Sequence, residues 1–289
     1  MKKIMAVLVA GVMSFTMFVG CDKVDEAKTF DATKGITVIS REQGSGTRGA
    51  FIELFKVEVK DGSGSKQDKT TDAAIIQNNT EGVISQVSGN EYAIGYISLG
   101  SLNDTVTALK IDGVDASAAN VKNGSYKVSR PFEIITKGET SPATKDFINY
   151  IMSKDGQAVV SKSYIAAKDD AVAFTSDKSA GKVVVGGSSS VSPVMEKLIE
   201  SYKTVNSNVT VELQTTDSGS GIKNVGASYD IGMSSRELTD AEKEGKTVTK
   251  LAIDGIAVIV NKVNTTKDLK AADVTKIYTG NSVKWNELV

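Results

Sequence analysis

The stretch ITVISREQGSGTRGAF, residues 36–51, carries the pattern that decides the fold. Its first four residues, 36–39, form a β-branched apolar run that predicts a strand, and residues 49–55 predict a helix. Between them lies a polar loop that contains glycine, serine and threonine. A strand that leads through a short loop into a helix is the repeating unit of an α/β fold.

The same unit recurs along the chain. Ser141 and Pro142 form a good N-cap and first-turn pair for a helix over residues 143–152, and Ser192-Pro193 opens another helix. Two polar stretches, residues 60–72 and 168–181, are predicted to be exposed connectors. The alternation of strands and helices predicts an α/β fold with mostly parallel strand pairing. The further strands are expected at residues 92–97, 132–135, 182–185, 209–213 and 253–260.

Composition removes several classes of function. The chain has 289 residues, 40% of them hydrophobic, which is enough for one large domain or two medium lobes. Its formal net charge of -1 argues against a nucleic-acid partner. The chain has no histidine and a single cysteine, so it cannot build a His/Cys zinc site, a His-based triad or an internal disulfide. We therefore expect no metal, no cofactor and no enzymatic activity.

The N-terminus has the features of an export signal. Lys2 and Lys3 precede an apolar run over residues 4–19, and the segment FVGC ends at Cys21. We expect residues 1–20 to be a lipoprotein signal peptide, Cys21 to carry the lipid, and residues 21–35 to be a tether. The alternative is an ordinary signal peptide with an incidental cysteine. The prediction places the protein on the outer face of the cytoplasmic membrane, anchored by lipid.

Three loops share one design, in which serine and glycine follow a strand and open a helix. They are residues 41–47, 186–190 and 217–221, and residues 232–237 add a Ser-Ser-Arg turn. Free backbone amides at a helix N-terminus, glycine and hydroxyl groups together suit an anion. Each loop alone is also explained as a capped turn, but three together predict a small anion. The spacing fits neither a P-loop nor a dinucleotide fingerprint, so a nucleotide is not predicted.

Arg41 is the predicted charged anchor, because a guanidinium binds phosphate oxygens as a bidentate fork. The alternative is a salt bridge from Arg41 to Glu42 or Glu53. Arg48 and Arg236 are weaker candidates.

Six segments resemble the signature of the phosphate-binding proteins of the phosphate-specific ABC importer. Their order in this chain is unusual, so the sequence looks circularly permuted, with residues 168–181 joining the old ends. The resemblance implies a type II-like periplasmic-binding-protein fold of two α/β lobes with a hinge and a central anion cleft. The six segments are residues 36–51, 183–198, 217–225, 229–238, 251–261 and 277–288.

The permutation leads us to expect a split lobe made of residues 36–107 plus 261–289 and a contiguous lobe of residues 108–260. The crossings between the lobes are expected near residues 108–131 and 260–264. Carried over by motif, the resemblance implies that phosphate is bound by Arg41, Ser45, Gly46, Thr47, Ser189, Ser190, Ser218 and Ser235.

Ser235 departs from the family pattern, because many relatives have an aspartate there. A carboxylate acceptor rewards the proton of phosphate and repels sulfate, whereas a hydroxyl discriminates less sharply. Glu42, Asp217 and Glu237 are candidate replacements for that carboxylate.

The resemblance implies that the protein captures inorganic phosphate as a monomer and hands it to the permease subunits of an ABC importer. Three alternatives remain open at this point. They are a binding protein for another tetrahedral oxyanion such as sulfate, a serine hydrolase that uses a loop serine, and a surface adhesion or scaffold protein.

Overall fold

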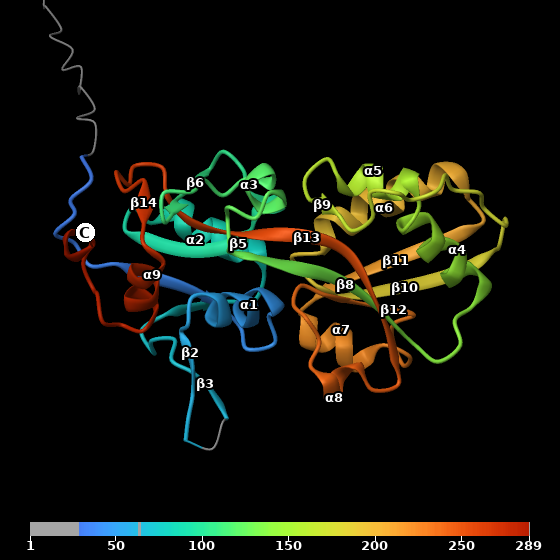
Figure 1. Cartoon of the computed structure of the whole chain (residues 1–289), viewed down its shortest axis with the longest axis horizontal. Helices are drawn as coiled ribbons and strands as arrows, with labels where there is room; N and C mark the ends of the chain where they lie inside the picture. Colours follow the sequence, from blue (N-terminus) through green and yellow to red (C-terminus); the bar gives the residue numbers. More distant parts are fainter. Residues whose placement is uncertain (1–28, 63–64, 289) are drawn as a thin grey trace, which may run out of the picture.

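A computed structural model describes residues 29–62 and 65–288. The predicted signal peptide, Cys21 and most of the predicted tether lie outside the described residues. The body is elongated and falls into a left half and a right half, which β8 (Ser129–Lys137) and β13 (Lys246–Asn261) connect (Figure 1). Within these residues no helix has the length and apolarity needed to cross a bilayer.

The helices lie on both sides of the central sheet (Figure 1). They are α1 (Gly46–Leu54), α2 (Thr80–Gly89), α3 (Ala118–Lys122), α4 (Pro142–Ile151), α5 (Lys154–Val160), α6 (Ser192–Val205), α7 (Ser218–Asn224), α8 (Asp240–Lys243) and α9 (Ala271–Tyr278), with 3₁₀ turns η1 (Leu99–Ser101) and η2 (Trp285–Glu287). The remaining strands are β1 (Thr37–Arg41), β2 (Glu58–Lys60), β3 (Lys66–Asp68), β4 (Ile75–Gln77), β5 (Ala93–Ser98), β6 (Val106–Ala108), β7 (Lys110–Ile111), β9 (Ile165–Ala166), β10 (Gly181–Ser188), β11 (Val209–Thr216), β12 (Ile231–Ser234) and β14 (Asp268–Leu269).

Helix starts follow the capping chemistry. Ser141 caps α4 by accepting the amide of Thr144, as its sequence pattern predicted. Helix α1 begins at Gly46, three residues before the predicted start, because Ser45 accepts the amide of Arg48. Helix α6 begins at Ser192 with Pro193 in its first turn, as predicted, and Val191 occupies the N-cap position.

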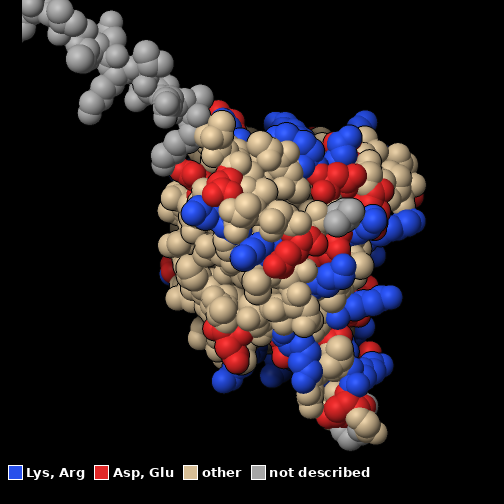
Figure 2. Space-filling model, turned by 90° about the vertical axis from the view of Figure 1, so that its left-hand side faces the viewer, with Lys and Arg blue, Asp and Glu red and all other residues tan. Residues whose placement is uncertain are grey.

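Residues 60–72, predicted to be a loop, contain part of an antiparallel hairpin formed by β2 and β3. That hairpin projects from the left half (Figure 1). On the end of the molecule drawn in Figure 2, acidic and basic side chains are interspersed, as the small net charge leads one to expect.

One sheet runs through both halves in the order β11-β10-β12-β8-β13-β5-β1-β4. Strand β10 is parallel to β11 and β12, and β1 is parallel to β4 and β5. In the centre, β8 and β13 pair antiparallel with each other and with their outer neighbours. The prediction of mostly parallel pairing therefore fails at the centre, because the chain crosses to the right half on β8 and returns on β13.

Each half has its own hydrophobic core. In the left core Phe51 stacks on Tyr96 with 3.9 Å between ring centroids, and Tyr278 packs edge-on against Phe51. The right core gathers aromatic and aliphatic side chains of α4, α6 and β10, including Phe147 and Tyr202. Burial of side chains of this size contributes about 1.5–3 kcal/mol each to folding, so each half has its own source of stability.

The two cores show in which half the residues near the predicted lobe boundary pack. Leu109 and Val128 pack in the left core, as does Val258 of β13. The predicted boundary at residue 108 put residues 109–128 with the contiguous lobe, whereas their buried side chains lie with the left half. The exact division into two lobes, and the circular permutation, stay predictions.

Candidate functional site

The carboxyl ends of β1, β10, β11 and β12 meet between the two halves, which is where open α/β sheets place their ligand sites. Their meeting brings the three predicted loops and the Ser-Ser-Arg turn into one polar cluster. All of its members are nearly excluded from solvent. The polar cluster consists of Arg41, Ser45, Gly46, Thr47, Ser188, Ser189, Ser190, Ser218 and Ser235.

Arg41 ends β1 and is 2% exposed. Its Nη2 donates to Ser189 Oγ of the right half across 3.1 Å. Its Nε and Nη2 also donate to the two carboxylate oxygens of Glu42, at 2.8 and 2.7 Å. The expected salt bridge to Glu42 therefore exists together with the contact to the polar cluster. A guanidinium has five N–H donors, so the bonds to Glu42 and Ser189 leave Arg41 with donors that can bind an anion.

Hydroxyl groups from both halves face one another in the cluster. Thr47 Oγ1 lies 2.7 Å from Ser190 Oγ, and Thr80 Oγ1 lies 3.4 Å from the same atom. Ser218 Oγ lies 3.3 Å from Ser235 Oγ. Because these groups sit on different elements, hydroxyl donors reach the same region from several directions.

Gly46 allows α1 to approach the right half closely. A Cβ at this position would overlap the hydroxyls of Ser218 and Ser235. Ser45, by contrast, uses its hydroxyl to cap α1. The structure thus assigns Ser45 a local role and Gly46 a spatial one.

The guanidinium groups of the weaker arginine candidates pair with other carboxylates, although Arg48 also donates to the backbone carbonyl of Arg41. Arg48 pairs with Asp68 at 2.7 Å, and Arg236 pairs with Glu242 at 2.7 Å. The Arg236–Glu242 pair lowers the pKa of the Glu242 carboxyl to about 2, because the guanidinium donates to its charged form.

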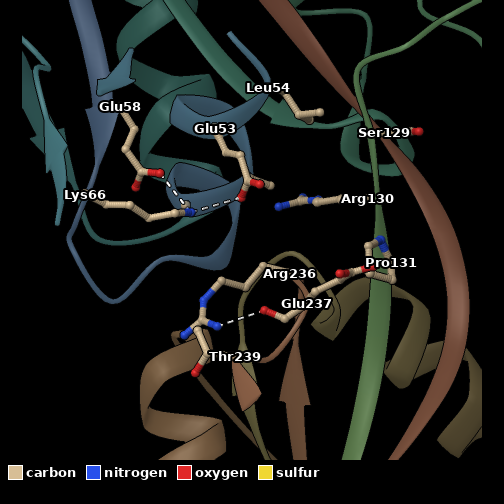
Figure 3. Close-up of a pocket in the computed structure, with 12 residues that line it drawn as sticks. Glu53, Leu54, Glu58, Lys66, Ser129, Arg130, Pro131, Arg236, Glu237 and Thr239 are labelled. Carbon is tan, nitrogen blue, oxygen red and sulfur yellow. Dashed lines mark hydrogen bonds and ion pairs between the residues drawn. The ribbon is translucent and has the colours of Figure 1, made fainter. Parts of the chain in front are cut away.

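The carboxylates considered as substitutes for the missing aspartate have other partners. Both oxygens of Glu42 are held by Arg41. Asp217 caps α7 and accepts the amide and hydroxyl of Ser220, at 3.0 and 2.6 Å. Glu237 lines a different cavity, which is drawn in Figure 3.

That cavity has a volume of about 400 Å³ and lies between α1 and the β2–β3 hairpin on one side and the segment around Arg236 on the other (Figure 3). Its basic side chains already have acidic partners. Lys66 pairs with Glu58 at 2.9 Å, and Arg236 pairs with Glu242. Arg41 also has an acidic partner, Glu42, but the polar cluster adds buried hydroxyl groups of both halves, such as those of Thr47 and Ser190, and is therefore the better anion site.

The sequence prediction missed a buried ion pair on the two crossing strands. Arg130 of β8 and Asp254 of β13 lie 3.1 Å apart and are fully buried. Desolvation raises the pKa of Asp254 to about 6, although Arg130 opposes the shift. The sequence gave no signal for this ion pair, since an isolated arginine and an isolated aspartate 124 residues apart do not indicate a pair.

The predicted site residues also did not include Ser188 and Thr80, although Ser188 directly precedes the predicted residues Ser189 and Ser190.

Across the described residues, no group of three or more His, Cys, Asp or Glu side chains is placed to hold a metal ion.

A family model described as a PBP superfamily domain matches residues 24–155 and 172–289. The phosphate-binding protein PstS 2 of Streptococcus agalactiae serotype V is 50% identical over 99% of this chain and 98% of its own length.

PstS 2 of Streptococcus pneumoniae serotype 4 is 44% identical over 99% of both chains. The solved structure of a phosphate ABC transporter phosphate-binding protein from Streptococcus pneumoniae TIGR4 has a TM-score of 0.71 and 47% identity. It is covered completely and covers 88% of this chain.

Proposed function

Because the chain belongs to the phosphate-binding proteins of the PBP superfamily, we propose that its polar cluster captures inorganic phosphate between the two halves. Members of this family are substrate-binding components of a transporter and not enzymes. The protein therefore holds its ligand and releases it unchanged.

The contact between Arg41 and Ser189 carries the proposal. These buried side chains come from opposite halves and meet at the carboxyl ends of β1 and β10. A buried dianion is stable only where many donors replace its water. Arg41 would supply the countercharge, and Thr47, Ser190 and Ser218 would supply hydroxyl donors from both sides.

A ligand that contacts both halves stabilises the closed arrangement more than an open one. The two halves would act as the lobes of a hinged binding protein, with β8 and β13 as the hinge. The predicted circular permutation changes the order of the segments along the chain and leaves this mechanism unaltered.

The closed, loaded form would then dock on permease subunits of an ABC importer as a monomer. Lipid attached to Cys21 would keep the protein on the outer face of the cytoplasmic membrane. The lipobox-like FVGC segment and the polar tether support this part of the proposal. Labelling with a radioactive fatty acid, in wild type and Cys21→Ser, tests it directly.

Titration calorimetry with phosphate, arsenate and sulfate tests the ligand. We expect phosphate and arsenate to bind with one site per chain. Sulfate binding tighter than phosphate would replace the assignment with a sulfate-binding protein. Absence of any anion-dependent rise in melting temperature would instead favour an adhesion or scaffold role.

A further inference from the structure

We infer that Arg48 and Asp68 are positioning residues of the anion site, although neither belongs to the polar cluster. Asp68, at the base of the β2–β3 hairpin, orients the Arg48 guanidinium, and that guanidinium fixes the backbone of Arg41. Because Arg41 is the proposed countercharge of phosphate, the affinity then depends on a residue of the hairpin. This inference rests on the proposed phosphate-binding function and deepens it.

Side chains hold both polar groups of the Arg41 main chain. Its amide donates to the Tyr96 hydroxyl across 3.2 Å, and its carbonyl accepts from Arg48 Nη1 at 2.5 Å. Tyr96 is fixed in turn, because its ring stacks on Phe51 and its hydroxyl lies 2.9 Å from Ser40 Oγ. Arg48 and Tyr96 therefore set the position from which the Arg41 side chain extends.

Arg48 also closes the loop that carries the left-half members of the polar cluster, residues 41–47. Its side chain holds Arg41 at the start of this loop, and its amide donates to Ser45 Oγ, near the end, across 3.3 Å. A loop that is fixed at both ends keeps its donors directed at one point, so less order has to be gained when an anion binds. The effect of Arg48 on the site is thus preorganisation.

The carboxylate of Asp68 holds the other edge of the Arg48 guanidinium. Its Oδ2 accepts from Arg48 Nε at 2.8 Å and lies 2.7 Å from Nη2, while its Oδ1 accepts the amide and the hydroxyl of Thr70 at 2.8 and 2.6 Å. Partial burial raises the pKa of Asp68, but the hydrogen bonds from Thr70 and Arg48 together hold it below its usual value. The carboxylate is therefore charged at neutral pH and both of its oxygens are held.

The base of the hairpin is attached to the left core. Lys69, which follows β3, donates its amide to the carbonyl of Val57 at 3.1 Å, and Val57 is fully buried in that core. Asp68 therefore presents its carboxylate from a fixed backbone. The projecting hairpin (Figure 1) is joined to the anion site through the contacts from Asp68 to Arg48 and from Arg48 to Arg41.

The sign of the effect separates positioning from simple electrostatics. A negative charge repels a bound anion, so on charge alone Asp68→Asn would tighten phosphate binding. If Asp68 positions Arg48, the same substitution weakens binding instead. A role confined to the stability of the hairpin would lower the melting temperature and leave the affinity unchanged.

Titration calorimetry with phosphate on wild type, Asp68→Asn and Arg48→Met tests the inference. We expect Asp68→Asn to weaken phosphate binding by about three- to tenfold, the worth of roughly one hydrogen bond, and Arg48→Met to weaken it by about tenfold or more. Adding Asp68→Asn to Arg48→Met should cost no further affinity, because Asp68 acts through Arg48. Where Arg48→Met folds poorly, Arg48→Gln provides a second removal of the bridge.

Glu58→Gln is the matched control. Glu58 lies opposite Asp68 in the hairpin, and the side chains are 18% and 27% exposed, but the Glu58 carboxylate pairs with Lys66. The control removes the same charge from the same pair of facing residues, and its phosphate affinity should stay within about twofold of wild type. Melting temperatures measured without ligand show whether each variant is folded.

Three results overturn the inference while leaving the proposed function in place. The first is an affinity in Asp68→Asn that equals or exceeds that of wild type. The second is additive losses in the double variant, which would mean that Asp68 acts independently of Arg48. The third is an equal loss in Glu58→Gln. A wild-type protein that binds no phosphate overturns the proposed function and the inference with it.

Discussion

The amide of Gly219 donates a hydrogen bond to the carbonyl of Gly44 across 3.1 Å, and the two residues belong to opposite halves of the molecule. Gly44 lies in the loop before α1, and Gly219 lies in the first turn of α7. A Cβ on Gly44 would overlap the carboxylate of Asp217. A larger residue at position 44 would therefore have to displace the Asp217 side chain in the closed arrangement, although Gly44 lies outside the polar cluster.

Gly44→Ala should weaken phosphate binding by at least about tenfold, a loss of about 1.4 kcal/mol. The added methyl group opposes closure, while an open form relieves the overlap, so the melting temperature without ligand should change little. Calorimetry measures the affinity, and small-angle scattering with saturating phosphate measures closure. Gly89→Ala is the control, because a Cβ there meets no atom within 4 Å. An unchanged affinity in Gly44→Ala would show that the contact does not limit closure.

Arg41→Lys should weaken phosphate binding by roughly a hundredfold. Lysine keeps the charge but loses the planar fork, and a hydrogen bond to a charged group is worth about 1.5–3 kcal/mol. Arg236→Lys is the matched control, since the Arg236 guanidinium pairs with Glu242 outside the polar cluster. Calorimetry on both variants gives the comparison. Equal losses in the two would assign the effect to general electrostatics and not to Arg41 itself.

Arg130→Met should destabilise the protein by about 3–5 kcal/mol, because it leaves Asp254 buried without its partner. The double variant Arg130→Met, Asp254→Leu should recover most of this loss, since it removes both buried charges. Urea unfolding at pH 7 measures the free energies. A double variant as unstable as the single one would mean that the lost packing, and not the charge, is responsible.

The same pair gives a pH dependence. The pKa of Asp254 is raised to about 6 in the folded protein, chiefly by desolvation. A carboxyl whose folded pKa lies above its unfolded value stabilises the folded state at low pH, and this contribution disappears as the pH rises through 6. Between pH 4 and pH 7 the free energy of unfolding should therefore fall in wild type relative to the Arg130→Met, Asp254→Leu variant. Urea titrations across this range check the sign.

Glu242→Gln should show the opposite dependence. The Arg236 guanidinium lowers the pKa of Glu242 to about 2, so its stabilising effect is present near neutral pH and is lost as the pH falls toward 2. Because the side chain is partly exposed, we expect a loss of about 1 kcal/mol at pH 7 and a smaller one at pH 3. Asp240→Asn is the control, because Asp240 is fully exposed and makes only a 3.7 Å pair with Lys243. Equal curves for Glu242→Gln and wild type at pH 7 would contradict the prediction.

The local elements were predictable because their signals are local. β-branched runs predicted β1 and β10, and Ser141-Pro142 predicted the start of α4. The pairing of β8 with β13 was not predictable, since apolar runs do not state the direction in which a neighbouring strand runs. The β2–β3 hairpin was missed because its short polar strands have the composition of a loop.

The sequence likewise predicted some features of the candidate site and not others. The motif residues Arg41, Ser189 and Ser218 could be named from the sequence, since glycine- and serine-rich turns after strands indicate an anion. Their contacts with one another, and the contacts of Ser188 and Gly44, depend on which chain segments meet. Those segments lie far apart in the sequence, as the separation of 148 positions between Arg41 and Ser189 illustrates.

The amino-acid sequence by itself determined the strands with β-branched apolar runs, such as β1 and β10, the capped start of α4, the absence of histidine chemistry and the residue types that an anion requires. These properties depend on backbone preferences and side-chain chemistry within a few residues of one another. Only the tertiary structure decided that Ser188 donates to Ser235 and that Glu42 and Asp217 have their oxygens already engaged. A hydroxyl both donates and accepts, so its direction is set by the neighbours that packing brings to it.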